Sequence, residues 1–172
     1  QNSDGDTEVP QTENGSVVTF DEETNGEPID DDIEVESERT TIYGNGVDKT
    51  ILDGSIEIES NESRVRSLTI RGDVSYGDNA NNSSLAFCKI HGSLEVESNE
   101  FTANNCVIFG DVSVSGNGAR LVNIGVGGEW EVNPNANCKG CYSFADENED
   151  TVVQDDEIGE DLTCGGGKDG KN

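Results

Sequence analysis

Apolar and polar side chains alternate along the middle of the chain in short segments that begin at a glycine. The segments GSIEI at 54–58 and GDVSV at 110–114 carry apolar residues two and four positions after the glycine. Alternation with a period of two places those side chains on one face, which is typical of a β-strand. A second alternating segment leads up to each glycine, so the glycine is predicted to mark a turn between two strands. Five glycines share this pattern: Gly54, Gly72, Gly92, Gly110 and Gly128.

The five glycines recur at intervals of 18, 20, 18 and 18 residues, and an asparagine stands seven positions after each of them. These asparagines are Asn61, Asn79, Asn99, Asn117 and Asn135. A fixed period of this length is the signature of a repeat architecture. Because asparagine tolerates the left-handed backbone conformation and its amide both donates and accepts hydrogen bonds, it can form a turn in every coil. The asparagines are therefore predicted to stack as a ladder, each bonded to its equivalents in the neighbouring coils.

The repeat predicts an all-β fold, a parallel β-helix or β-solenoid, over residues 31–144. Its 18-residue coils would number about six, counting an imperfect first copy, IEVESER at 33–39. Residues 1–30 and 145–172 are predicted to be acidic extensions that cap the two ends, with a strand at 16–20. A β-sandwich also contains short alternating strands, but nothing in it would keep glycine and asparagine in phase.

The segment TTIYGNGVDKTILDG at 40–54 resembles the opening coils of right-handed parallel β-helices of the pectin-lyase-like superfamily, where the phrase G-x-G-x-x-x-T-x-I/L-x-G recurs. The in-phase asparagines are similar to the ladder of that superfamily. The resemblance covers residues 30–144 and implies a right-handed coil. Left-handed hexapeptide-repeat helices are the main alternative, but their L-G-x-x-x-x hexads are not kept here. Superfamily members that cleave uronates present Asp, Lys, Arg and often calcium on an outward groove, and this set is not evident here, so the resemblance implies the fold and not an enzyme.

The chain has 37 acidic and 10 basic residues and a formal net charge of −27. Such a charge repels both a phosphate backbone and an anionic membrane surface, which argues against nucleic-acid binding. No apolar run approaches the roughly 20 residues that a membrane span needs, so membrane insertion is not expected. High acidity suits a halophilic source, where concentrated salt screens self-repulsion, and equally a calcium-rich exterior.

Acidic side chains recur on the predicted outward face, where glutamates after the glycine alternate with serines in successive coils. The alternation doubles the spacing between like charges, which fits a solvated acidic face. Calcium bridging between neighbouring acids is the alternative, because calcium binds about six to eight oxygens. The candidate calcium ligands are the adjacent carboxylates of Asp30, Asp31 and Asp32, whose spacing does not match an EF-hand loop. The sequence predicts no cofactor and leaves calcium binding as an open alternative.

Five cysteines and four N-x-S/T sequons favour an oxidising extracellular or cell-surface location. The sequon asparagines are Asn14, Asn61, Asn81 and Asn82. Cys88 and Cys106 fall in the same inward column of adjacent coils, where a disulfide and a stacked reduced pair are both open alternatives. One disulfide among the remaining three cysteines could pin the C-terminal cap and leave one thiol for an intermolecular bond. Those three are Cys138, Cys141 and Cys164.

Apolar side chains stand at three strand positions before the glycine where exposure to solvent is expected, namely Ile51, Val107 and Phe109. Exposed apolar side chains on a flat strand face usually mean that something covers them. The cover could be the strand at 16–20 of the same chain or another subunit. The three residues are therefore a candidate self-association patch.

These observations favour a secreted structural protein without enzymatic activity, which self-associates as a homo-oligomer or polymer into an extracellular filament, sheath or surface layer. A polysaccharide-binding or polysaccharide-degrading β-helix is the alternative from another class. A virion fibre or spike module would share the same fold.

Overall fold

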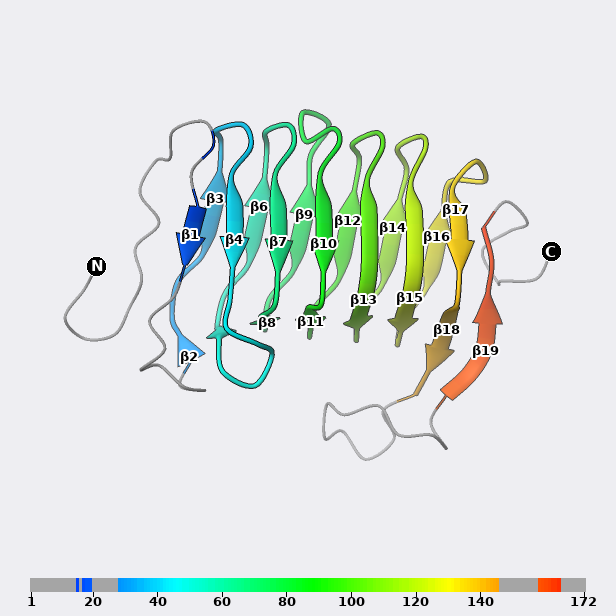
Figure 1. Cartoon of the computed structure of the whole chain (residues 1–172). Helices are drawn as coiled ribbons and strands as arrows, with labels where there is room; N and C mark the ends of the chain where they lie inside the picture. Colours follow the sequence, from blue (N-terminus) through cyan, green and yellow to red (C-terminus); the bar gives the residue numbers. More distant parts are fainter. Residues whose placement is uncertain (1–14, 16, 20–27, 146–157, 165–172) are drawn as a thin grey trace.

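The computed structural model describes residues 15, 17–19, 28–145 and 158–164. Within these residues all regular secondary structure is β, and the strands stack in parallel as a β-solenoid of about five turns (Figure 1). The predicted fold class is thus confirmed, and the predicted six coils are close to the observed number. In the described part of the chain there is no helix long and apolar enough to cross a membrane.

Each coil contributes short strands to three faces. The first face consists of β1 (Val17–Thr19), β4 (Thr41–Tyr43), β7 (Arg64–Arg66), β10 (Ser84–Ala86), the first halves of β13 (Thr102–Ile108) and β15 (Arg120–Val126), and β17 (Asn137–Lys139). The second face consists of β2 (Pro28–Ile29), β5 (Ile51–Leu52), β8 (Thr69–Ile70), β11 (Lys89–Ile90), the second halves of β13 and β15, and β18 (Cys141–Phe144). The third face is a separate six-stranded sheet of β3 (Ile33–Val35), β6 (Ile56–Ile58), β9 (Val74–Tyr76), β12 (Leu94–Val96), β14 (Val112–Val114) and β16 (Trp130–Val132).

The coils stack in register, so that equivalent residues form columns. On the third face Glu95 pairs with Ser75 and Ser113 in the two adjacent coils, as the alternation of acid and serine predicts. In Figure 1 the strands of the first face run downward in front, the fainter strands of the third face run upward behind, and successive coils advance from left to right. The coil is therefore right-handed.

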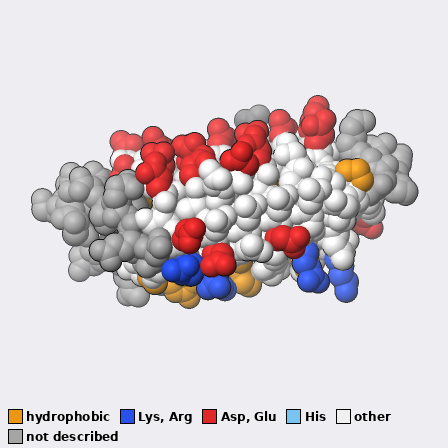
Figure 2. Space-filling view, turned by 90° about the horizontal axis from the view of Figure 1, so that it is seen from above, with side chains coloured by type: hydrophobic (Ala, Val, Ile, Leu, Met, Phe, Trp, Pro, Cys, Tyr) orange, Lys and Arg blue, Asp and Glu red, His pale blue; other side chains and the backbone are white. Residues whose placement is uncertain are grey.

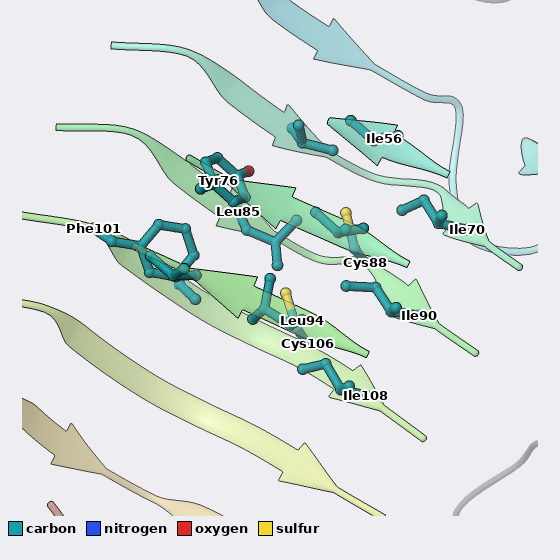
Figure 3. Packing of buried hydrophobic residues seen from close by; sticks show 14 of the residues in the cluster. Ile56, Ile70, Tyr76, Leu85, Cys88, Ile90, Leu94, Phe101, Cys106 and Ile108 are labelled. Atoms are coloured by element: carbon teal, nitrogen blue, oxygen red, sulfur yellow. The ribbon is translucent and has the colours of Figure 1, made fainter. Parts of the chain in front are cut away.

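The core consists of the inward side chains of all three faces. Alternate residues are buried in strands such as β6 and β12, whose pattern is buried, exposed, buried. Figure 3 shows Ile70, Ile90 and Ile108 in one row, each from the next coil. Tyr76 and Phe101 fill the corner between the third and first faces, with ring centroids 4.8 Å apart.

The N-terminal strand β1 adds to the first face. It pairs in parallel with β4, with Val18 opposite Ile42, so the strand predicted within 16–20 is present. Strand β1 does not cover Val107 or Phe109, because both lie on the second face. Val107 is part of β13, and Phe109 directly follows that strand. One of the two covers that the sequence left open is thereby excluded.

The C-terminal cap is formed by β19 (Ile158–Leu162), which pairs antiparallel with β18. A disulfide joins Cys138 to Cys164, with Cα atoms 5.4 Å apart, and the indole Nε1 of Trp130 donates to the carbonyl oxygen of Thr163 at 3.0 Å. The predicted pinning of the cap by one disulfide is confirmed. The remaining thiol, Cys141, is free and 1% exposed, and an intermolecular bond through it stays a prediction.

Candidate functional site

The edge between the second and third faces is built on the repeated glycines. From Gly72 onward, each glycine N–H donates to the carbonyl oxygen of the preceding glycine, as from Gly110 to Gly92 at 2.8 Å. A Cβ on Gly110 would lie 2.6 Å from that oxygen, closer than real contacts allow. The glycines recur because two backbones approach one another at this edge.

A second ladder runs beside the glycines and was not foreseen from the sequence, where these residues are assigned to the solvated outward face. Asp32 and the residues after the first four glycines each accept, through a side-chain oxygen, the N–H of the equivalent residue in the next coil. The Oδ1 of Asp73 accepts from Ser93 at 2.8 Å, and the Oγ of Ser93 accepts from Asp111 at 3.0 Å. The ladder is Asp32, Ser55, Asp73, Ser93, Asp111 and Glu129. The alternation of Asp and Ser directly after the glycine is the signal that could have revealed it.

The asparagine ladder lies on the edge between the third and first faces. The Oδ1 of Asn99 accepts the N–H of Asn117 at 2.8 Å, and Asn135 donates through Nδ2 to the Oδ1 of Asn117 at 2.9 Å. Asn61, Asn99, Asn117 and Asn135 take the predicted positions. The prediction for Asn79 is wrong, because Asn81 accepts the N–H of Asn99 at 2.8 Å and donates its own N–H to Asn61 at 2.9 Å.

The exchange of Asn79 for Asn81 has a simple cause. The two extra residues between Gly72 and Gly92 precede the ladder position, so counting from the glycine stops two residues short, at an exposed side chain. The left-handed backbone conformation, moreover, belongs to the residue after the ladder asparagine. Glu62, Asn82 and Glu100 have φ values of 60°, 59° and 59°. The asparagines themselves contribute their side-chain acceptors.

The outward side of the third face is acidic. Seen from above in Figure 2, Asp and Glu side chains line one long edge of the solenoid. Partial burial and a hydrogen bond with Glu57 raise the pKa of the Glu59 carboxyl, and a hydrogen bond with Glu36 together with its charge raises that of Glu34. Crowded like charges thus already disfavour ionisation on this face. The predicted acidic face is confirmed.

The outward side of the first face is basic and aromatic. In Figure 2, Lys, Arg and hydrophobic side chains gather along the edge opposite the acidic one. The guanidinium carbon of Arg66 lies 5.9 Å from the centre of the Tyr43 ring and 5.4 Å from that of Phe87. Tyr43 is 48% exposed and Phe87 47%. Sequence reasoning missed this cluster, because its three members come from three different coils.

The second face carries a groove of about 620 Å³, whose lining includes Phe87, Lys89, Val107, Phe109 and Tyr142. Ile51, Val107 and Phe109 are half-buried on this face. Phe109 packs edge-on against Phe144, with ring centroids 5.1 Å apart, so the C-terminal end of the same chain supplies part of the cover. Whether the three residues also mediate self-association stays a prediction.

A histidine stands beside the groove. The ring of His91 contacts the edge of the Phe109 ring at a centroid distance of 5.7 Å. Partial burial and the nearby charges of Lys89 and Arg71 lower the pKa of His91 below its usual 6.5. The imidazole is therefore neutral at neutral pH.

The paired thiols of Cys88 and Cys106 lie side by side in the core (Figure 3). Both are buried and free, so of the two alternatives the structure shows the stacked reduced pair. Burial raises the pKa of the Cys106 thiol well above its usual value, which keeps it protonated and unreactive.

The remaining candidates are the aspartates and the sequons. Asp32 accepts the N–H of Ser55 through Oδ1, and Asp31 accepts that of Asp32 at 2.9 Å. Asp30 is exposed, and the described residues contain no group of three or more His, Cys, Asp or Glu side chains arranged to hold a metal. Calcium binding there stays a prediction.

Of the sequon asparagines, Asn14 lies outside the described residues. Asn61 and Asn81 use their side-chain oxygens as ladder acceptors. Asn82 is exposed and has a φ of 59°. Glycosylation stays a prediction at all four positions.

No family model matches the chain, and neither a curated protein nor a solved structure matches it.

Proposed function

We propose that this protein is a secreted structural protein whose solenoids associate side by side into an extracellular filament, sheath or surface layer. One observation carries the proposal: the recurring Asp, Ser and Asn side chains at two edges of the solenoid are engaged in holding the coils together. Asp73, Asp111, Asn99 and Asn117 each interact with an adjacent coil through a side-chain acceptor. Such ladders produce a stiff rod with flat, repetitive faces, as an assembly subunit needs.

Side-by-side contact is favoured over end-to-end stacking by the C-terminal cap. β19, the Cys138–Cys164 disulfide and the bond from Trp130 to Thr163 lie at the end where a further coil would have to add. The disulfide also supports the proposed extracellular location, because disulfides persist mainly in oxidising compartments. Membership of the pectin-lyase-like superfamily is part of the proposal, supported by the phrase at 40–54 and the right-handed coil.

Sedimentation velocity of the full chain tests self-association. We expect species larger than one chain at physiological or high salt, with and without calcium, because salt screens the repulsion of a net charge of −27. A single species with the mass of one chain under every condition would refute the proposal.

A second candidate is polysaccharide binding in the groove of the second face. It is favoured by the convergence of Phe87, Phe109 and Tyr142 with the ammonium of Lys89, because aromatic rings and one charged group are typical of ligand sites. A glycan array with and without calcium tests it, and a clear hit for one polysaccharide would favour this function over assembly.

A further inference from the structure

We propose that the first face of one copy docks against the third face of a second copy; this inference rests on the proposed function and names the surfaces that would carry it. The sign of the charge differs between these two faces in a systematic way. Among the described residues no Lys or Arg lies on the third face, and four lie on the strands of the first face. Those four are Arg64, Arg66, Arg120 and Lys139, while Arg39 at the edge is already paired with Glu38 and Glu62.

The third face supplies the complementary charges. Its outward positions, in and directly after the strands, hold glutamates in two adjacent columns along the solenoid. They are Glu34, Glu36, Glu57, Glu59, Glu95, Glu97 and Glu131. Partial burial and then a hydrogen bond with Glu57 and its charge raise the pKa of Glu59, and a hydrogen bond with Glu36 and its charge raise that of Glu34, so part of each shift is repulsion between neighbouring carboxylates. A basic surface docked on the glutamate columns would relieve this repulsion. An acidic or neutral surface would not relieve it.

The spacing of the charges also matches. Arg64 and Arg120 share one column of the first face and are three coils apart, through Ser84 and Thr102. Glu34 and Glu95 share one column of the third face and are likewise three coils apart, through Glu57 and Ser75. At the usual strand spacing both separations are about 14 Å. The two arginines of one copy can therefore meet the two glutamates of another, with the solenoid axes either parallel or antiparallel.

The cluster of Tyr43, Arg66 and Phe87 is suited to the centre of such an interface. Both rings are about half exposed, and the guanidinium lies between them within 6 Å of each. Arginine and tyrosine are enriched in the residues that dominate binding energies, and a side chain already held in place loses less entropy on docking.

The contact joins two different surfaces, so a docked pair of copies leaves one basic face and one acidic face unpaired. Such a heterologous contact propagates into an open array or closes into a ring, and does not stop at a dimer. This outcome agrees with a filament, sheath or layer. It also explains why a chain with a large net negative charge keeps its few basic residues off one face.

Charge reversal with rescue tests the inference by sedimentation velocity of the full chain at physiological salt. One variant carries Arg64→Glu and Arg120→Glu, and the other carries Glu34→Arg and Glu95→Arg. We expect each variant alone to associate at least tenfold more weakly than the wild type. We expect an equimolar mixture to recover assembly, because each variant then finds the opposite charge on the other. Arg71→Glu, on the second face, is the matched control and should assemble as the wild type does.

Far-UV circular dichroism identifies any charge-reversal variant that fails to fold. In that case the milder single substitutions Arg66→Gln and Glu95→Gln are used instead. Each of them is expected to weaken association. If the wild type assembles and neither variant differs from it, the docking surfaces are wrong while the proposed function stands. Loss of assembly in only one of the two variants, or no rescue in the mixture, equally overturns the pairing of these faces. If the wild type never assembles, the proposed function itself fails.

Discussion

The side-chain oxygen of Asn99 accepts the backbone N–H of Asn117, one coil further along the solenoid, at 2.8 Å. Replacing Asn99 with alanine leaves this N–H without its acceptor, which we expect to lower the free energy of unfolding by about 1 kcal/mol. Asn79→Ala is the matched control, because Asn79 is exposed and outside the ladder. Thermal or denaturant unfolding of the two variants measures the difference. Equal stabilities would show that the ladder contributes nothing.

The carboxylate of Asp73 accepts the N–H of Ser93 at 2.8 Å, so its role in the structure is that of an acceptor. Asp73→Asn keeps an acceptor oxygen and is expected to unfold close to the wild-type temperature. Asp73→Ala removes it and should cost about 1 kcal/mol. If the two substitutions destabilise the protein equally, the hydrogen bond is not what this position provides.

The Cys138–Cys164 disulfide closes a loop of 26 residues over the end of the solenoid. Reduction should release the cap and expose Trp130, the single tryptophan, which is now 4% exposed and bonded to Thr163. We therefore expect a red shift of tryptophan emission on reduction and a loss of about 3 kcal/mol of stability. A variant with Cys138→Ser and Cys164→Ser should be insensitive to reductant. Unchanged emission in the reduced wild type would contradict the capping role.

The pKa of Glu59 is raised above its usual 4.5 by partial burial first and then by Glu57, so the folded state holds this proton more tightly than the unfolded chain. The ionised group therefore costs stability at neutral pH, and the cost disappears as the pH falls below 4.5. Glu59→Gln should raise the stability at pH 7 by about 0.3 kcal/mol and leave it unchanged at pH 4. Glu131→Gln is the control, because its column neighbour is the uncharged Ser113. A gain for Glu59→Gln that is the same at both pH values would argue against charge repulsion.

The fold could be predicted from the sequence because its determinants are local and periodic. Inward columns such as Ile70, Ile90 and Ile108 repeat at the coil length, and each must return to the same side of the coil to be buried. The same counting failed at Asn79, since a period does not say on which side of a ladder position an insertion lies. It also missed the ladder of Asp73 and Ser93, because alternation marks a residue as outward without revealing which backbone group is beside it.

The charged surfaces were harder to foresee for a different reason. The glutamates of the third face recur at two phases of the repeat and are visible in the sequence. Tyr43, Arg66 and Phe87 occupy no single column, since Phe87 lies at the corner after its strand, with a φ of 54°. Their contact depends on side chains reaching across coils and on a turn conformation, neither of which a periodic pattern encodes. The free thiols of Cys88 and Cys106 show the same limit, because a shared column allows a disulfide without requiring it.

Electron microscopy of the purified full chain at physiological salt tests self-association most directly. The account predicts multi-copy particles or arrays in which elongated subunits lie side by side with aligned axes. Fields of isolated single rods, at concentrations where the protein is folded and in both the presence and absence of calcium, would contradict it.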